Sequence, residues 1–308
     1  MPTLQPNFRS DLVQGLDMRE KELLEKWRQT PPEGELVLYP GCNSLALPHL
    51  LDASFMNGIS VSGSWDLCCG EMYYRMGLFD QVMRRAEELT DYYRDKKIGT
   101  MLFNCPACLN MFRNVLPDQF GARFNFRTAY LETYLLEQIE DGNIRPINKI
   151  GKTVTIHDSC QGRILGREVM SANRRLLEQC GIAIVEMEHS GEDGLCCGAA
   201  AGANRHNPFD ILSSASRALK EGEKVMKQGA VELALYCGGC QLTLCASRFI
   251  VPTRQPVRHV LEYVKEACGE GSHNPTKKRC VQMLLNILVK CFPKYLSSRR
   301  FWISNKPG

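Results

Sequence analysis

The sequence lacks several features that would assign it to common functional classes. No apolar run approaches the roughly 20 residues that a membrane-spanning helix requires, and the longest, 281–289, is interrupted by Gln282 and Asn286. The first ten residues are polar and lack the apolar core of a secretory signal. The stretch Gly198–Gly202 lacks the lysine and serine or threonine of a phosphate-binding loop. We therefore expect a cytoplasmic protein with reduced thiols and no flavin or nucleotide in this chain.

Acidic residues are absent from segment 277–308, which carries eight Lys and Arg. The whole chain has 38 basic and 34 acidic residues, so the remainder is slightly acidic. We expect this basic extension to dock on an acidic partner protein, and peripheral contact with an anionic membrane is the second interpretation. No DNA-binding motif or aromatic stacking pattern accompanies the charge, which excludes nucleic acid as an expected partner.

Length and composition predict a folded chain with two main domains. The 308 residues exceed the usual size of one domain. Hydrophobic residues make up 44% and charged residues 23%, as in ordinary globular proteins. The expected division is a helical N-terminal arm (1–34), a first domain (35–145), a second domain (146–270) and a basic C-terminal extension (271–308).

Strand-like apolar runs alternate with helical stretches in both halves, which is typical of an α/β fold. We expect strands at 36–39, 59–61, 100–103, 153–156, 182–187 and 232–236, and helices at 11–28, 80–96, 167–180, 208–228 and 278–296. The order of elements in the first half recurs in the second. This recurrence indicates an internal duplication.

Fifteen cysteines carry most of the functional information. They are about 5% of the residues, too few for a small disulfide-stapled fold. Ten of them form two copies of one pattern, a single Cys, then Cys-Cys-Gly, then Cys-x-x-Cys. The first copy is Cys42, Cys68, Cys69, Cys105 and Cys108, and the second is Cys160, Cys196, Cys197, Cys237 and Cys240.

This pattern indicates one iron–sulfur cluster in each half, because thiolates are the usual cluster ligands. Cys42, Cys105 and Cys237 directly follow apolar strands, and Cys160 follows another by three residues. Ligands of open α/β sheets bind in a crevice beyond the carboxyl ends of the strands. Each set of five cysteines should therefore surround one such crevice. The side chains of two consecutive cysteines point apart. They can therefore bind two different metal atoms of one cluster more easily than a single ion.

Two details qualify the cluster hypothesis. Gly70 and Gly198 follow the vicinal pairs, where a residue without a side chain lets the backbone turn closely around sulfur, and we assign them to cofactor binding. The first gap of the first copy has 25 residues and that of the second copy 35, so the N-terminal site is the one whose completeness is open.

Other interpretations of the cysteines remain open. A structural zinc site of Cys105, Cys108, Cys237 and Cys240 would match a four-cysteine geometry, although it leaves the vicinal pairs unexplained. A thioredoxin-like role of a Cys-x-x-Cys motif would not require those pairs either. The cysteines outside the pattern are interpreted as buried apolar side chains, and they are Cys180, Cys245, Cys268, Cys280 and Cys291.

Four further polar residues lie near the cysteine motifs. His157 is either a hydrogen-bond donor that tunes a cluster through sulfur or a structural histidine, and we do not expect it to be a ligand. Arg163, Arg167 and Arg205 are either surface arginines or sites that attract an anionic substrate.

The duplicated pattern resembles the cysteine-rich CCG domains of the B-subunit family of heterodisulfide reductases. The local strings Leu38–Cys42, His157–Cys160 and Leu195–Gly198 carry the likeness, which covers about 35–250. Related domains occur in iron–sulfur components of glycolate oxidase, in quinone-reactive dehydrogenases and in heterodisulfide-reductase-like complexes of bacterial sulfur oxidation. The resemblance implies two duplicated Rossmann-like domains related by a pseudo-twofold axis.

The resemblance also implies a function. Each set of five cysteines would hold a noncubane [4Fe-4S] cluster, and a disulfide or carrier-bound sulfur substrate would exchange one electron with each. Expected partners are a ferredoxin-like iron–sulfur subunit and a flavin subunit of a larger complex. One alternative is an electron-relay role in a quinone-linked dehydrogenase. Another is the same sulfur chemistry in the oxidising direction, because the direction of electron flow depends on the relative reduction potentials of the reactants.

Overall fold

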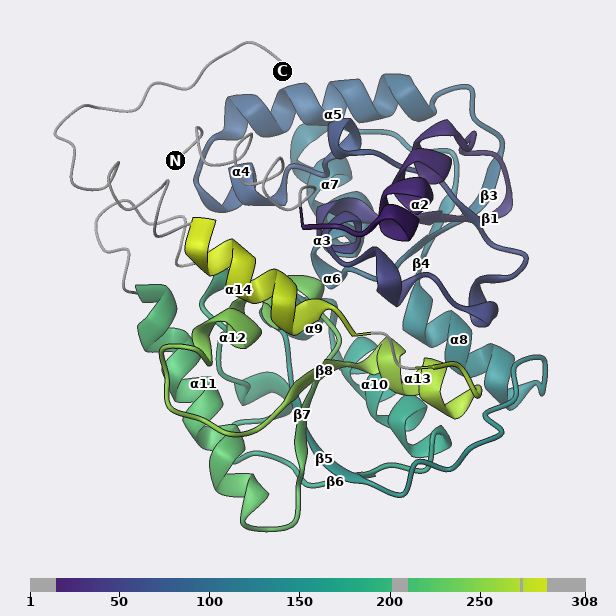
Figure 1. Ribbon diagram of the computed structural model, residues 1–308. Coiled ribbons are helices and arrows are strands. Elements are labelled where there is room, and N and C mark those ends of the chain that lie inside the picture. The colour runs from purple at the N-terminus through teal and green to yellow at the C-terminus, as the bar shows by residue number, and fades with distance from the viewer. Residues whose placement is uncertain (1–14, 201–209, 272–273, 287–308) are drawn as a thin grey trace, which may run out of the picture.

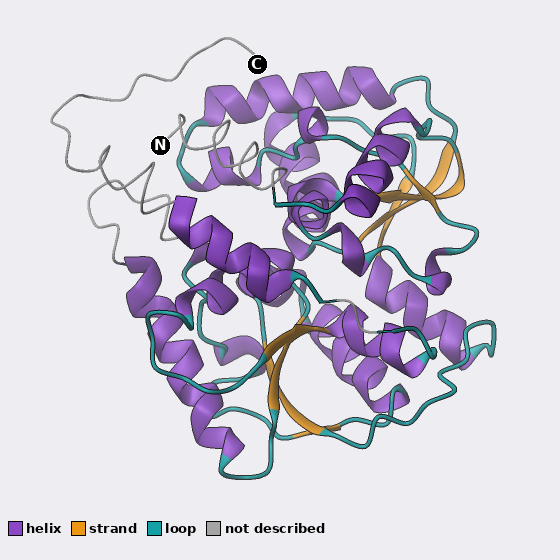
Figure 2. Cartoon of the chain, in the orientation of Figure 1, coloured by secondary structure: helices purple, strands orange, loops and turns teal. Residues whose placement is uncertain are grey.

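The computed structural model describes residues 15–200, 210–271 and 274–286. Two four-stranded parallel sheets, each accompanied by helices, form the protein (Figures 1 and 2). The strand order is β2-β1-β3-β4 in the first sheet and β6-β5-β7-β8 in the second. Because the two orders correspond strand by strand, the predicted duplication of an α/β domain is confirmed.

The strands are short, and the last strand of each sheet was not predicted. The first sheet comprises β1 (Gly34–Tyr39), β2 (Ser60–Val61), β3 (Ile98–Phe103) and β4 (Arg127–Tyr130), and the second β5 (Thr153–His157), β6 (Ala183–Ile184), β7 (Glu232–Leu235) and β8 (Val257–His259). β4 and β8 contain polar residues and have no apolar run of their own. They form because a neighbouring buried strand supplies their hydrogen-bond partners.

Helices surround both sheets. They are α2 (Met18–Gln29), α3 (Gly41–Ala46), α4 (Glu71–Arg75), α5 (Phe79–Tyr93), α6 (Pro106–Asn110), α7 (Leu116–Phe120), α8 (Leu131–Glu140), α9 (Cys160–Leu165), α10 (Arg167–Gln179), α11 (Asp210–Met226), α12 (Gly238–Ser247), α13 (Val260–Ala267) and α14 (Thr276–Asn286). A π-helical turn, η4 (Met111–Val115), joins α6 to α7. The predicted stretches 11–14, 208–209 and 287–296 lie outside the described residues.

Apolar spacing explains the long elements. In α5, Val82, Ala86, Leu89 and Tyr93 are buried at intervals of three or four residues, so one face packs on the sheet. β1 and β3 pair in parallel at the centre of the first sheet, and their carboxyl-terminal halves are fully buried. A strand covered on both faces is expected to be apolar without alternation.

One hydrophobic core cluster, with residues from Trp27 to Cys280, extends over both sheets, and a second cluster lies within the second half. Helix α8 of the first half packs against α10 of the second. At this junction Asn173 Nδ2 donates to the Tyr130 hydroxyl over 3.3 Å, and that hydroxyl donates to the Tyr236 carbonyl over 3.4 Å. The two halves therefore fix each other's position. The boundaries drawn at 34, 145 and 270 remain predictions.

Helix α14 packs against the N-terminal arm through a buried ion pair. The Arg279 guanidinium donates to both Glu20 carboxylate oxygens, at 2.6 and 2.5 Å, and to the Ala46 carbonyl at 2.6 Å. The side chains of Arg279 and Glu20 are only 2% and 4% exposed. Ala46 ends α3, the helix that carries Cys42, so α14 anchors both α2 and the carboxyl end of α3.

Within the described ranges, no helix combines the length and apolar character needed to cross a bilayer.

Replacing Arg279 tests the contribution of this ion pair to stability. Arg279→Met leaves the Glu20 carboxylate buried without its cation, so the free energy of unfolding should fall by about 3–5 kcal/mol. Equilibrium urea unfolding followed by fluorescence measures the change. Adding Glu20→Gln should recover part of the loss. Arg28→Met is the control, because Arg28 pairs with Glu25 on the exposed face of the same helix α2, and it should leave stability unchanged. Equal losses in the two variants would contradict the assignment.

Candidate functional site

Four of the six cysteine motifs begin helices at the carboxyl ends of central strands. Each helix starts within three residues of its strand, so its first turn faces the edge where ligands of parallel sheets bind. The positions are Cys42 in α3 after β1, Cys105 and Cys108 in α6 after β3, Cys160 in α9 after β5, and Cys237 and Cys240 in α12 after β7.

The five cysteines of the first copy contact one another in series. The Cys42 and Cys68 thiols are hydrogen-bonded, and so are those of Cys68 and Cys69. Cys108 Sγ donates to Cys69 Sγ over 3.5 Å and also contacts Cys105. The short stretch of 25 residues between Cys42 and Cys68 therefore does not separate either cysteine from the other members of the set.

The second copy repeats this arrangement. Cys160 is hydrogen-bonded to Cys196, and Cys196 to Cys197. Cys197 and Cys237 both contact Cys240. In this set Cys160 and Cys196 are half-buried and the other three are buried.

One contact joins the two sets. Cys105 at the start of α6 and Cys237 at the start of α12 lie close enough to shift each other's pKa, so the ten thiols form one group across the two sheets. The fourteen cysteines in the described ranges form no disulfides. A connected group of thiols at the junction of two domains is suited to metal binding, because no disulfide competes for the sulfur atoms.

Each set contains one thiol that ionises more readily than its neighbours. Hydrogen bonds from Cys108 and Cys237 lower the pKa of Cys105. Hydrogen bonds from Cys196 and Cys240 lower the pKa of Cys197 in the same way. Metal ligation requires the thiolate, so a lowered pKa at these two sulfur atoms favours ligation.

Glycines shape the backbone around the sulfur atoms. Gly70 and Gly198 have φ of +81° and +87°, a region that other residues rarely adopt. A Cβ on Gly198 would lie 2.6 Å from the Ile211 carbonyl oxygen, whereas one on Gly70 would meet only ordinary contacts. The glycine nearest to sulfur is Gly41, which we did not single out from the sequence, and a Cβ there would lie 2.7 Å from Cys108 Sγ.

His157 lies inside the second set. A ring nitrogen and the sulfur atoms of Cys197 and Cys240 are all within 4.8 Å of one another. The ring is 1% exposed, and neither nitrogen has a hydrogen-bond partner among the described residues. Burial lowers the pKa of His157 to about 4, so the ring is neutral. Buried polar atoms are normally hydrogen-bonded. The His157 nitrogen beside two thiols would gain a partner if the site held a group that carries sulfur acceptors or a metal.

A polar group at the junction was not predicted from the sequence. Arg75 Nη2 donates to Cys160 Sγ over 3.3 Å, and its Nε donates to Glu71. Gln161 Nε2 donates to Glu71 Oε1 over 3.1 Å, and Asn110 Nδ2 donates to Gln161 Oε1 over 3.0 Å. No periodicity or motif marks these residues, since the contacts depend on how the two domains meet.

A second unpredicted residue is Glu132, which is fully buried at the start of α8. Burial raises the pKa of this carboxyl well above its ordinary value. The side chain also lies close enough to Cys105 for a thiolate there to raise this pKa further.

Of the arginines considered from the sequence, Arg163 and Arg167 bind Glu192 instead of a thiol. Arg163 Nη1 donates to the Glu192 carbonyl over 3.0 Å, and Arg167 pairs with the Glu192 carboxylate on the surface. Arg205 lies outside the described residues, as does Cys291 among the remaining cysteines. Of the others, Cys180, Cys245 and Cys280 are buried, as predicted, and Cys268 is half-buried.

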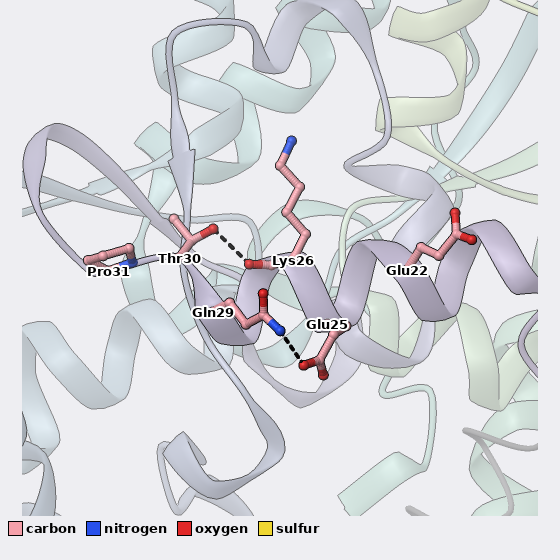
Figure 3. A pocket seen from close by; sticks show the side chains of 6 residues that line it. All are labelled: Glu22, Glu25, Lys26, Gln29, Thr30 and Pro31. Carbon is pink, nitrogen blue, oxygen red and sulfur yellow. Dashed lines mark hydrogen bonds between the residues drawn. The ribbon is translucent and has the colours of Figure 1, made fainter.

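A hollow beside α2 lies on the N-terminal arm (Figure 3). Gln29 Nε2 donates to Glu25 Oε1 over 2.6 Å, and the Thr30 hydroxyl donates to the Lys26 carbonyl over 2.7 Å. These groups satisfy one another within one helix, and no thiol lines the hollow. We assign it no part in the site.

Comparison with known proteins places this arrangement in a family. Residues 38–113 and 154–245 both match the family described as a cysteine-rich domain, CCG. The D-subunit of dihydromethanophenazine:CoB–CoM heterodisulfide reductase from Methanosarcina barkeri is 26% identical over 268 residues, which cover 81% of this chain and 64% of that protein.

Two other relatives match shorter parts. EtfAB:quinone oxidoreductase from Syntrophomonas wolfei is 28% identical over 199 residues, 59% of this chain and 26% of that protein. A Bacillus subtilis protein named "Probable iron-sulfur-binding oxidoreductase FadF" is 32% identical over 157 residues, 49% of this chain and 21% of that protein. This chain thus spans less than two thirds of the length of these relatives. Since both halves match one family over more than half of the chain, the protein belongs to the CCG cysteine-rich domain family.

Proposed function

We propose that this chain is the iron–sulfur catalytic subunit of a heterodisulfide-reductase-like complex. It exchanges electrons with a disulfide, thiol or carrier-bound sulfur substrate at two noncubane [4Fe-4S] clusters. The observation that carries the proposal is the group of ten thiols without disulfides, in two sets that meet at Cys105 and Cys237. The relatives named as heterodisulfide reductase are D-subunits, and the finer assignment to the B-subunit family is part of the proposal.

The ligands follow from the two sets. Cys42, Cys68, Cys69, Cys105 and Cys108 hold the first cluster, and Cys160, Cys196, Cys197, Cys237 and Cys240 hold the second. Gly70 and Gly198 turn the backbone beside the vicinal pairs. When bound, the clusters supply the one-electron chemistry that thiols alone do not provide.

The arrangement of the sets suits sulfur chemistry in particular. Reductive cleavage of a disulfide needs two electrons, and two sites in contact can deliver one electron each to one substrate. Cys42, Cys160 and Cys196 are half-buried, so each set has a side that a substrate can approach. The remaining ligands are buried and hold the frame.

A four-cysteine zinc site is the principal competing interpretation. Cys105 contacts both Cys108 and Cys237, and Cys237 contacts Cys240, so these four thiols do lie together. The zinc interpretation leaves unexplained why Cys69 contacts Cys108 and Cys197 contacts Cys240. A cluster in each half uses all ten thiols.

Partners and location belong to the same proposal. Electrons arrive from a ferredoxin-like subunit with cubane clusters and ultimately from a flavin subunit, in a cytoplasmic complex. The basic segment 277–308 docks on an acidic partner protein, with peripheral membrane contact as the second choice.

A second candidate function is electron relay to a quinone without cleavage of a sulfur bond. The observation that favours it is the likeness to a protein named EtfAB:quinone oxidoreductase. Sulfur oxidation at the same two sites is the reverse operation, and the potentials of the partners set its direction.

Metal analysis tests the two-site proposal. Purified anaerobically, the chain should contain about eight iron atoms, four for each cluster. Cys197→Ala removes the most readily ionised thiol of the second set, so about half of the iron and one of two paramagnetic signals should be lost. Cys268→Ala, which changes a half-buried cysteine outside both sets, is the control and should retain all iron. Zinc without iron, or loss of both signals in Cys197→Ala, would refute two independent sites.

Titration with a sulfur substrate separates catalysis from relay. Adding a disulfide to the reduced protein should produce a new electron paramagnetic resonance signal, because a cluster that exchanges an electron with sulfur changes its spin state and surroundings. A quinone analogue added instead should reoxidise the clusters without that signal. If disulfides give no signal and the quinone reoxidises the protein, the relay function is correct.

A further inference from the structure

The two copies of the motif differ just after the Cys-Cys-Gly triplets. Gly70 is followed by Glu-Met-Tyr-Tyr-Arg, whereas Gly198 is followed by Ala-Ala-Ala-Gly-Ala. At the distance from the glycine where the first copy has Arg75, the second copy has Ala203. The duplication has kept the ten cysteines and has not kept an arginine at this spacing.

Arg75 extends from its own domain to the site of the other domain. It ends α4, which begins directly after the first vicinal pair, and its Nη2 lies 3.3 Å from Cys160 Sγ of the second set. The side chain is 23% exposed. Its position is fixed on the other side by Glu71, whose carboxylate binds Nε and also accepts from Gln161.

Holding a cation against a ligand sulfur has a predictable electrostatic effect. Reduction adds one negative charge to a cluster and its thiolates, and a nearby cation with a hydrogen bond to sulfur stabilises the reduced form more than the oxidised form. Arg75 is always protonated. Because the contact is partly buried, solvent and salt screen it less than a surface pair.

Each set also has an uncharged nitrogen group beside its sulfur atoms. In the first set Asn43 Nδ2 donates to Cys105 Sγ over 3.5 Å, and in the second set His157 lies beside Cys197 and Cys240. The corresponding residue of the first copy, three positions before its single cysteine, is Tyr39, whose hydroxyl donates to the Leu67 carbonyl. The charged donor Arg75 contacts the second set, whereas the side-chain donor to Cys105 of the first set is the neutral amide of Asn43.

We propose that Arg75 is a positioning residue that raises the reduction potential of the second site and makes the two duplicated sites unequal. The inference rests on the proposed function, since it requires a redox group in each set. The step it concerns is the transfer of one electron from a reductant to the second site, in which no bond is made or broken. The second site therefore accepts its electron more readily than it would without Arg75.

Redox titration of single variants tests the proposal. The anaerobic protein is titrated with dithionite and followed by electron paramagnetic resonance, and the second-site signal is identified as the one that Cys197→Ala removes. In Arg75→Met the midpoint of that signal should fall by about 59 mV, a tenfold change in the ratio of reduced to oxidised site. The first-site midpoint should stay unchanged. Arg75→Lys, which keeps the charge, should restore most of the shift.

The matched control is Arg163→Met. Arg163 lies on α9, three residues after Cys160, and contacts a carbonyl instead of a sulfur, so the second-site midpoint should change much less than in Arg75→Met and the first-site midpoint should stay unchanged. If Arg75→Met does not fold, Arg75→Gln removes the same charge with a smaller change of shape and should show the same fall. Normal iron content with an unchanged second-site midpoint would overturn the inference. An equal shift in Arg163→Met would also overturn it, since the effect would then be one of overall charge. Absence of iron from the parent protein would refute the proposed function instead.

Discussion

The contact between Cys105 and Cys237 is the interaction around which this structure is organised. Each cysteine is the N-cap of a helix that follows the central strand of its sheet. The contact exists only because the carboxyl ends of two parallel sheets face each other. If the two sheets met at any other edge, the protein would have two separate groups of five thiols. One bound molecule could then not contact both groups.

The rest of the fold holds this junction in place. Helices α8 and α10 pack across the junction, and the Tyr130 hydroxyl links them to the start of α12 through the Tyr236 carbonyl. On the other side, Arg279 binds Glu20 and the carbonyl at the end of α3, so the terminal helices fix the helix that carries Cys42. A buried ion pair contributes little more to stability than apolar side chains in the same place would. Removing only one partner, however, lowers the free energy of unfolding considerably, because the other charge stays buried without a partner. Such pairs therefore favour one arrangement of the elements they join.

The duplication explains why the two sites are alike, and the junction explains why they differ. Within each set, one cysteine has its pKa lowered by two neighbouring thiols, and the same relation recurs at Cys105 and Cys197. Between the sets the symmetry ends, since Arg75 crosses to Cys160 and His157 has Tyr39 as its counterpart. The two sets of cysteines are therefore alike in sequence pattern and unlike in surroundings.

The sequence by itself determined the α/β class, the duplication and the ten cysteines, because these depend on local apolar runs and on a motif with fixed order. It also indicated the positions of the central strands and long helices, whose periodicity is strong. It missed β4 and β8, which are short, partly polar and stabilised by a neighbouring strand.

The tertiary structure alone decided how the two sets meet. The contacts of Arg75, Glu71 and Gln161 join residues up to 90 positions apart. The close approach of Gly41 to Cys108 likewise comes from packing between separate helices. Such contacts depend on the relative placement of two domains, and no local pattern of residues encodes that placement.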